Sequence, residues 1–152
     1  MAAAFRFQFL LEQTQEKSGK AARLMAEVKA QWQAALQKQE QLQQFINDYQ
    51  QRFLAAQAGG LSVSQWRDYQ LFLGKLDRAM VQQANDVTLI QQRFETARDQ
   101  WLELQKQVKA LQALADRQAH SDAVRIGKRE QKELDEYAAK LMARRTQDDA
   151  DE

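Results

Sequence analysis

Apolar residues recur at alternating steps of four and three along most of this chain, and one Gly-Gly pair interrupts them. This spacing places the residues on one face of a helix and is typical of a coiled coil. Before the break the stripe consists of Phe7, Leu11, Thr14, Ser18, Ala21, Met25, Val28, Trp32, Ala35, Gln39, Leu42, Ile46, Tyr49 and Phe53. After the break it consists of Trp66, Tyr69, Leu73, Leu76, Met80, Gln83, Val87, Ile90, Phe94, Ala97, Trp101, Leu104, Val108 and Leu111. We call these two stripes the seam. They predict an all-α fold, a long antiparallel two-helix coiled-coil hairpin with its turn near Gly59-Gly60.

Helix breakers are scarce, since the 152 residues include no proline and only five glycines. Long helices are therefore expected, the first over residues 5–57 and the second over residues 64–145. Residues 58–62 are expected to form the turn, and residues 146–152 a frayed acidic tail. Ser62 and Gln65 fit a capping box, with Ser64 as the competing cap. The whole chain, 1–152, is expected to be a single coiled-coil stalk.

The position of the turn predicts how the helices pair. If the turn is centred on Gly59-Gly60, Phe53 faces Trp66 and Met25 faces Phe94. With this pairing the first helix ends opposite about residue 112 of the second helix, so the C-terminal helix overhangs the N-terminal one. An amphipathic helix without a partner gains little from packing. We therefore expect another protein to stabilise this overhang.

Several apolar residues lie beside the seam rather than on it. Phe45 and Phe72 each precede a seam residue by one position, on the flank of the expected hairpin. We call these residues, together with seam residues on the same edge, the flank set: Leu42, Phe45, Tyr49, Phe72, Leu76, Ala79 and Gln83. A two-helix coil cannot bury the outer half of such side chains. Two interpretations stay open, a partner-binding surface or aromatic rings that thicken a thin core.

No arrangement of residues indicates catalysis, a cofactor or a metal. His120, Ser121 and Asp122 are consecutive, so on a helix their side chains point in different directions and cannot form a catalytic triad. Cysteine is absent, and no apolar run is long enough to span a membrane. The start of the chain does not fit a signal peptide, and a cytoplasmic protein is expected.

The formal net charge is +1, which gives no global attraction to nucleic acid or membrane. Positive charge is concentrated on the overhang, where acidic residues are interleaved with it. Interleaved acids argue against a DNA-binding basic region. A solvated face and a surface that docks on an acidic protein both remain open.

Four segments resemble the FliJ family, the soluble stalk of the bacterial flagellar type III export apparatus. They read FRFQFLLEQTQEKSGKAARLMAEV (5–28), LSVSQWRDYQLFLGKLDRAMVQQ (61–83), QWLELQKQVKALQALADRQ (100–118) and REQKELDEYAAKLMARR (129–145). They lie in collinear order over nearly the whole chain. The Phe-rich start, the Trp66-x-x-Tyr69 pair and the terminal Asp-Glu-Tyr-Ala segment are the most specific features.

The resemblance implies a non-enzymatic stalk of flagellum biogenesis with several protein partners. Family members insert the end that carries both termini into the hexameric flagellar export ATPase, contact the membrane export-gate protein and handle export chaperones. The resemblance assigns gate binding to the flank set, with Gln83 where some members have His and Phe45 where a Tyr occurs. Residues expected to bind the ATPase ring are Phe7, Leu11, Arg125, Lys128, Arg129, Lys132, Leu134, Tyr137 and Leu141.

The expected location is the cytoplasm, in peripheral association with the inner-membrane export apparatus. We expect a monomer in isolation that promotes assembly and activity of the ATPase ring. Two alternatives remain from the sequence: the equivalent stalk of a virulence-type injectisome, or a generic coiled-coil scaffold that associates with itself.

Overall fold

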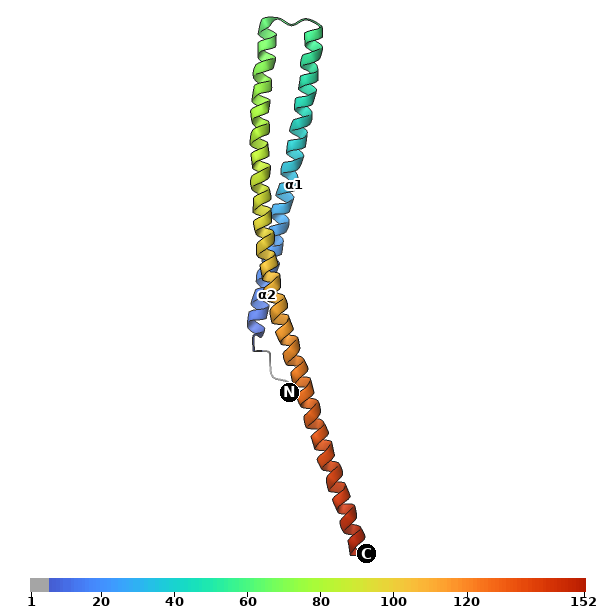
Figure 1. Cartoon of the computed structure of the whole chain (residues 1–152). Helices are drawn as coiled ribbons and strands as arrows, with labels where there is room; N and C mark the ends of the chain where they lie inside the picture. The colour runs from blue at the N-terminus through green and yellow to red at the C-terminus, as the bar shows by residue number, and fades with distance from the viewer. Residues whose placement is uncertain (1–5) are drawn as a thin grey trace. The chain divides into compact units, whose positions relative to one another are not determined.

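Two long helices make up almost all of the computed structural model, which describes residues 6–152 (Figure 1). Helix α1 spans Gln8–Ala58 and helix α2 spans Val63–Asp151. The helices pack against each other, and the described residues contain no strand, so the predicted all-α hairpin is confirmed. The expected start at Phe5 lies outside the described residues. Helix α2 continues to Asp151, so the segment expected to fray after residue 145 is helical.

The chain divides into two compact units. One contains residues 17–104, and the other combines the start of the chain up to Glu16 with Gln105–Glu152. The turn and the flank set lie in the 17–104 unit, whereas all the residues expected to bind the ATPase ring lie in the other. That the two units behave as a single stalk stays a prediction.

In the 17–104 unit the two helices run antiparallel on either side of the turn (Figure 1). Buried side chains follow the predicted seam. On α1 they are Ser18, Val28, Ala35, Ile46 and Phe53, and on α2 they are Leu76, Val87 and Ala97. No large side chain among the described residues is less than 2% exposed. The core is therefore shallow, because each helix has one helix to pack against.

Residues at the turn both end α1 and begin α2. Gly60 has a φ of +90°, a conformation that glycine adopts without strain. The Gly59 amide donates to the Ala55 carbonyl at 3.2 Å, which closes the last turn of α1. The Gln65 amide donates to the Ser62 hydroxyl, and the Ser62 amide donates to the Gln65 side-chain oxygen, both at 3.1 Å. The predicted capping box with Ser62 as the cap is confirmed.

The second unit places the N-terminal end of α1 with the C-terminal part of α2. Leu11 and Thr14 are buried at 4% and 5% exposure, and the Thr14 hydroxyl donates to the Leu10 carbonyl at 2.7 Å. On α2 the covered stripe continues through Gln118 to Asp122, which is 7% exposed. Every residue from 127 to 152 is exposed. We call residues 127–152 the exposed C-terminal segment.

The exposed C-terminal segment begins later than residue 112, where the sequence placed the start of the overhang. Phe94 stacks on Trp32 with 5.4 Å between ring centroids, whereas the expected register placed it opposite Met25. The ring next to Phe53 is Tyr69 at 5.3 Å, one seam position later than Trp66. These ring contacts do not shift the register as a whole, because Phe45 lies 6.4 Å from Phe72 and Tyr49 lies 5.4 Å from Tyr69 between centroids, close to the expected pairing.

We expect Ser62→Ala to reduce the free energy of unfolding by about 1 kcal/mol, because it removes one of the two capping hydrogen bonds. Urea denaturation followed by circular dichroism measures the change. Ser64→Ala is the matched control and should have a smaller effect. A larger loss for Ser64→Ala than for Ser62→Ala would contradict the observed cap.

Candidate functional site

Two rings of the flank set form an exposed aromatic surface in the 17–104 unit. Phe45 on α1 is 48% exposed and Phe72 on α2 is 37% exposed. Their centroids lie 6.4 Å apart in an edge-to-face arrangement with planes at 74°. Tyr49 stands 4.7 Å from Phe72 and 6.4 Å from Phe45, so the three rings form one cluster that joins both helices. We call Phe45, Tyr49 and Phe72 the aromatic flank.

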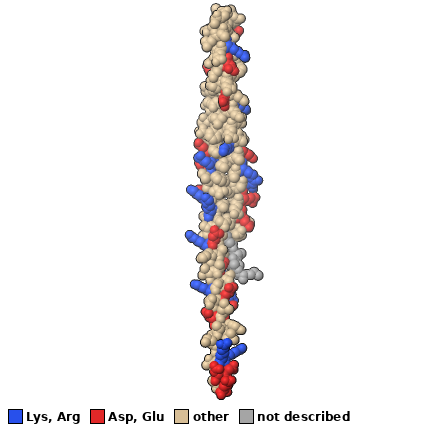
Figure 2. Space-filling view, turned by 90° about the vertical axis from the view of Figure 1, so that its right-hand side faces the viewer, with Lys and Arg blue, Asp and Glu red and all other residues tan. Residues whose placement is uncertain are grey.

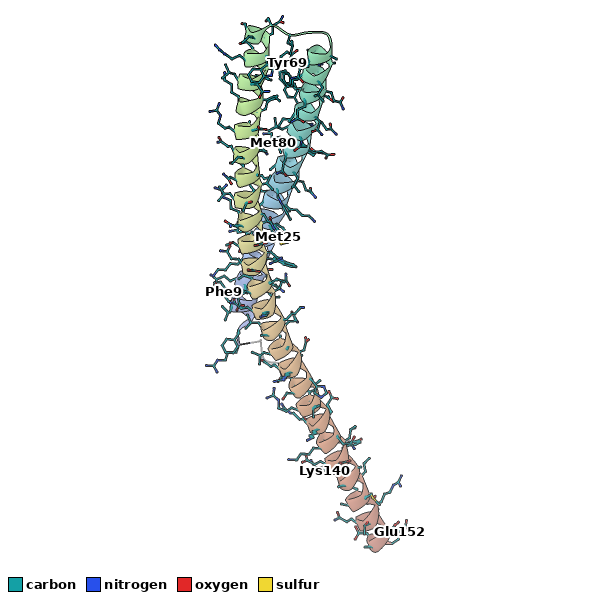
Figure 3. All side chains as sticks on the ribbon, turned by 45° about the horizontal axis from the view of Figure 1, so that its top comes forward. Phe9, Met25, Tyr69, Met80, Lys140 and Glu152 are labelled. Atoms are coloured by element: carbon teal, nitrogen blue, oxygen red, sulfur yellow. The ribbon has the colours of Figure 1, made fainter. Side chains whose placement is uncertain are left out.

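The aromatic flank continues towards the turn. Tyr69 lies 5.4 Å from Tyr49 and 5.3 Å from Phe53, between centroids. Figure 3 shows Tyr69 in the space between the two helices. The flank therefore rests on the half-buried ring of Tyr69 and the buried ring of Phe53.

The other members of the flank set divide into two groups. Ala79 is exposed and available to a partner, whereas Leu42 is half-buried and Leu76 is 8% exposed within the seam. Gln83 is half-buried, and its amide nitrogen donates to the Ala35 carbonyl of α1 at 2.9 Å. Leu76 and Gln83 thus hold the hairpin together. That the whole set binds an export gate stays a prediction.

The bond from Gln83 to Ala35 was not foreseen. The sequence placed Gln83 on the seam but could not show that its amide reaches a backbone carbonyl of the other helix. A polar residue at an otherwise apolar coiled-coil position is the signal that could have found it, because such residues set the register.

Burial raises the pKa of the Tyr49 hydroxyl above 10.0, and the neighbouring Tyr69 and Asp68 raise it further. The folded state therefore holds the phenolic proton more tightly than the unfolded chain does. This contribution to stability is fully present below pH 10 and is lost as the pH rises through the folded pKa.

Residues expected to bind the ATPase ring near the N-terminus differ in accessibility. Phe7 is 40% exposed, and the Arg6 guanidinium lies 5.3 Å from its ring centroid. Leu11 is 4% exposed and packs in the core of its unit. Phe7 can contact a partner directly, whereas Leu11 is buried and can affect binding only by stabilising its unit.

On α2 the remaining ring-binding residues are all exposed. Leu134, Tyr137 and Leu141 are 63%, 64% and 43% exposed. With 3.6 residues per turn, positions 134, 137 and 141 lie on one face of α2, and the basic positions 125, 128, 129 and 132 lie on the opposite face. The exposed C-terminal segment thus has an apolar side and a basic side, and the basic side also carries the acidic residues Asp135 and Glu136.

Two of the basic residues also have partners in the chain. Arg125 forms an ion pair with Asp122 at 2.9 Å, which compensates a carboxylate whose side chain is 10% exposed. Arg129 lies 3.6 Å from Glu133, both highly exposed. Exposed pairs of this kind contribute little to stability. Figure 2 shows carboxylates gathered at the extreme end of α2, with basic side chains just before them.

The described residues 6–152 contain no group of three or more His, Asp or Glu residues arranged to hold a metal ion. His120, Ser121 and Asp122 are successive residues of α2, and His120 and Ser121 are exposed whereas Asp122 is buried. Within the same residues, neither helix has a stretch long and apolar enough to cross a bilayer.

Comparisons with known proteins give one consistent result. The sequence model of the family described as "Flagellar FliJ protein" matches residues 3–147. The chain is 28% identical over 125 residues to the flagellar FliJ protein of Salmonella typhi, covering 82% of this chain and 85% of the relative. It is 26% identical, with the same coverage, to the flagellar FliJ protein of Escherichia coli (strain K12). No solved structure matches the chain.

We expect Gln83→Ala to reduce the free energy of unfolding by about 1–2 kcal/mol, because it removes the hydrogen bond to Ala35 and part of the seam packing. Gln82→Ala, on an exposed neighbour, is the matched control. Urea denaturation of both variants provides the comparison. Equal effects would show that the Gln83 side chain does not hold the helices together.

Stability should depend less on pH in Tyr49→Phe than in the wild type above about pH 10, because the raised pKa of Tyr49 no longer contributes. The measurement is the melting temperature at about pH 9 and about pH 11. Tyr137→Phe, on a 64% exposed tyrosine, is the control and should keep the wild-type dependence. A Tyr49→Phe curve parallel to the wild type above pH 10 would refute the linkage.

Proposed function

The chain belongs to the flagellar FliJ protein family, and from that premise we propose that it is a non-enzymatic stalk and adaptor of the flagellar type III export apparatus. In this proposal the exposed C-terminal segment enters the ring of the hexameric export ATPase and promotes its assembly and turnover. The aromatic flank contacts the membrane export gate, and export chaperones bind as further partners. The protein works in the cytoplasm, peripherally associated with the inner-membrane export apparatus.

One observation carries the ATPase part of the proposal. The exposed C-terminal segment presents Leu134, Tyr137 and Leu141 on one face, and the opposite face carries Lys128, Arg129 and Lys132 together with Asp135 and Glu136. A flat partner could cover one of these faces at a time. A partner that surrounds the helix, such as a ring, can contact both. Unequal contacts with the subunits would favour one arrangement of the ring over another, which is how binding shifts a conformational equilibrium.

The flagellar assignment is favoured over an injectisome stalk because the family and both curated relatives are named as flagellar. A scaffold that associates with itself would instead cover the apolar side of α2 with a second copy. Static light scattering separates the stalk from the self-associating scaffold, since the stalk should have the 17.6 kDa mass of one chain.

Removal of the residues after Ile126 should abolish stimulation of the export ATPase while leaving the hairpin folded. The covered stripe reaches Asp122, so this truncation deletes the exposed C-terminal segment and spares the packed part. ATP turnover and hexamer formation by the purified ATPase are measured with and without the protein, and circular dichroism checks the fold. Full stimulation by the truncated chain would refute the ring assignment.

Two double variants test whether the partner surrounds the segment. Leu134→Ser with Leu141→Ser alters the apolar face, and Lys128→Glu with Lys132→Glu alters the basic face. A ring predicts that each pair reduces stimulation. If one pair has no effect, the partner contacts a single face and the ring geometry is wrong.

A further inference from the structure

Positions spaced by seven residues keep the same relation to the seam of the 17–104 unit, because the seam itself repeats every seven residues. The positions that directly precede every second seam residue lie on the side of the hairpin that carries the aromatic flank. On α1 they are Lys17, Leu24, Gln31, Lys38 and Phe45, and on α2 they are Phe72, Ala79, Asp86, Arg93 and Gln100. We call this side of the unit the flank side.

Beyond the aromatic flank, a groove runs along the flank side between the two helices. It consists of two surface depressions, of about 380 Å³ and about 400 Å³, which share Leu89 and Arg93 in their lining. The first depression reaches Lys38 and Gln83, and the second reaches Leu24. Because Gln83 is also a member of the flank set, the groove adjoins that set directly.

The groove has small buried side chains in its floor and apolar side chains on its rim. Ala35 and Ala97 in the floor are 6% and 5% exposed, whereas Leu24 and Leu89 on the rim are both 47% exposed. The distance at which two helices pack depends on the side chains between them, so a floor of alanines admits a third helix. An amphipathic helix that lays its apolar face into such a groove is a recurrent mode of recognition.

Three charged side chains line the groove in the order positive, negative, positive. Since Gln83 bonds to Ala35, Lys38 lies on the turn side of Asp86, and Arg93 lies beyond Asp86. No ion pair within residues 6–152 involves any of these three charges. A partner that fits the groove therefore carries acidic residues opposite the two cations and a basic residue opposite the carboxylate.

The groove and the aromatic flank together have the length of one helix. From Leu24 to Phe45, α1 rises by about 30 Å. A partner helix of about 20 residues has the same length. One continuous helix could thus contact the aromatic flank at one end and the rim leucines at the other.

We propose that the gate contact of the aromatic flank continues along the groove, and that one amphipathic helix of the export-gate protein occupies both. The inference rests on the proposed function, which assigns the aromatic flank to the gate. Continuity of the groove with that flank, on the same side of the hairpin, makes the gate its occupant. The helix places its apolar stripe between Leu24 and Leu89 and its charged residues against Lys38, Asp86 and Arg93.

The experiment measures binding of the full-length chain to the purified cytoplasmic portion of the export-gate protein encoded by the same genome. Leu24→Ser with Leu89→Ser alters the rim of the groove, and Phe45→Ala alters the aromatic flank. The matched control is Leu36→Ser with Leu102→Ser, two leucines of the same unit that are 41% and 44% exposed on the opposite side of the seam. Circular dichroism confirms that the variants keep their helicity.

The groove variant and Phe45→Ala should each bind the gate about tenfold or more weakly, because truncating a central apolar contact of an interface has effects of this size. The control should bind like the wild type. If Phe45→Ala weakens binding and the groove variant does not, the groove is not part of the contact, although the proposed function stands. If the wild type does not bind, gate contact itself fails and the inference fails with it.

Charge reversal tests the electrostatic part of the proposal. Lys38→Glu with Arg93→Glu should weaken gate binding about tenfold at low salt, and the loss should shrink as salt screens the contacts. Lys29→Glu with Arg98→Glu, on the opposite side of the seam, is the control with the same change in net charge. Equal losses in the two pairs would show a dependence on net charge alone and would overturn the groove contact.

The absence of cysteine from the chain allows the occupant to be mapped by cross-linking. Leu24→Cys and Lys38→Cys are each labelled with a photoactivatable cross-linker, and the captured residues are identified by mass spectrometry. The two positions lie about 21 Å apart along α1, so a helix in the groove predicts captured gate residues about 14 apart in one segment. Captured residues about six apart would indicate an extended segment and overturn the helix. Capture of a second copy of the chain in place of the gate would overturn the proposal.

Discussion

The packing of one helix against one other helix limits how deeply any side chain of this protein can be buried. Even the best-covered seam residues, Ile46 at 3% and Leu11 at 4%, retain some exposure. Wide rings beside the seam cannot be enclosed, so Phe45 and Phe72 pack with one face and leave the other open. Residues that stabilise the hairpin are therefore also partly exposed on its surface.

Much of the fold follows from the sequence because seam burial depends on local periodicity. Every predicted seam position from Leu11 to Phe53, and from Tyr69 to Leu111, is buried or half-buried. The turn was equally predictable, since the reciprocal bonds of Ser62 and Gln65 involve residues three apart and the stop needs a glycine at positive φ. A heptad repeat and a capping signature specify these features without knowledge of the rest of the chain.

Features that depend on contacts between the helices were less predictable. The repeat places Gln83 and Phe72 on the same side of α2, about three turns apart. Only the arrangement of α1 shows that Gln83 reaches Ala35 while Phe72 stays 37% exposed. Contacts between large rings were missed for a similar reason. Large rings lean along the helix, so Phe94 meets Trp32 instead of Met25. Burial of Asp122 was unexpected because a carboxylate interrupts the apolar pattern, and its ion pair with Arg125 compensates for that.

The exposed C-terminal segment follows a different physical rule, because nothing else among residues 6–152 covers it. Local pairs hold it, such as Gln131 with Asp135 at 3.0 Å and Arg129 with Glu133 at 3.6 Å. These pairs contribute a few tenths of a kcal/mol each and leave the apolar face in water. A partner gains free energy by covering Leu134 and Tyr137, which are more than 60% exposed. The same partner gains electrostatic contacts from the basic side only if it reaches around the helix. A partner that encloses this segment could thus contact both sides of α2, whereas a flat partner would contact only one side.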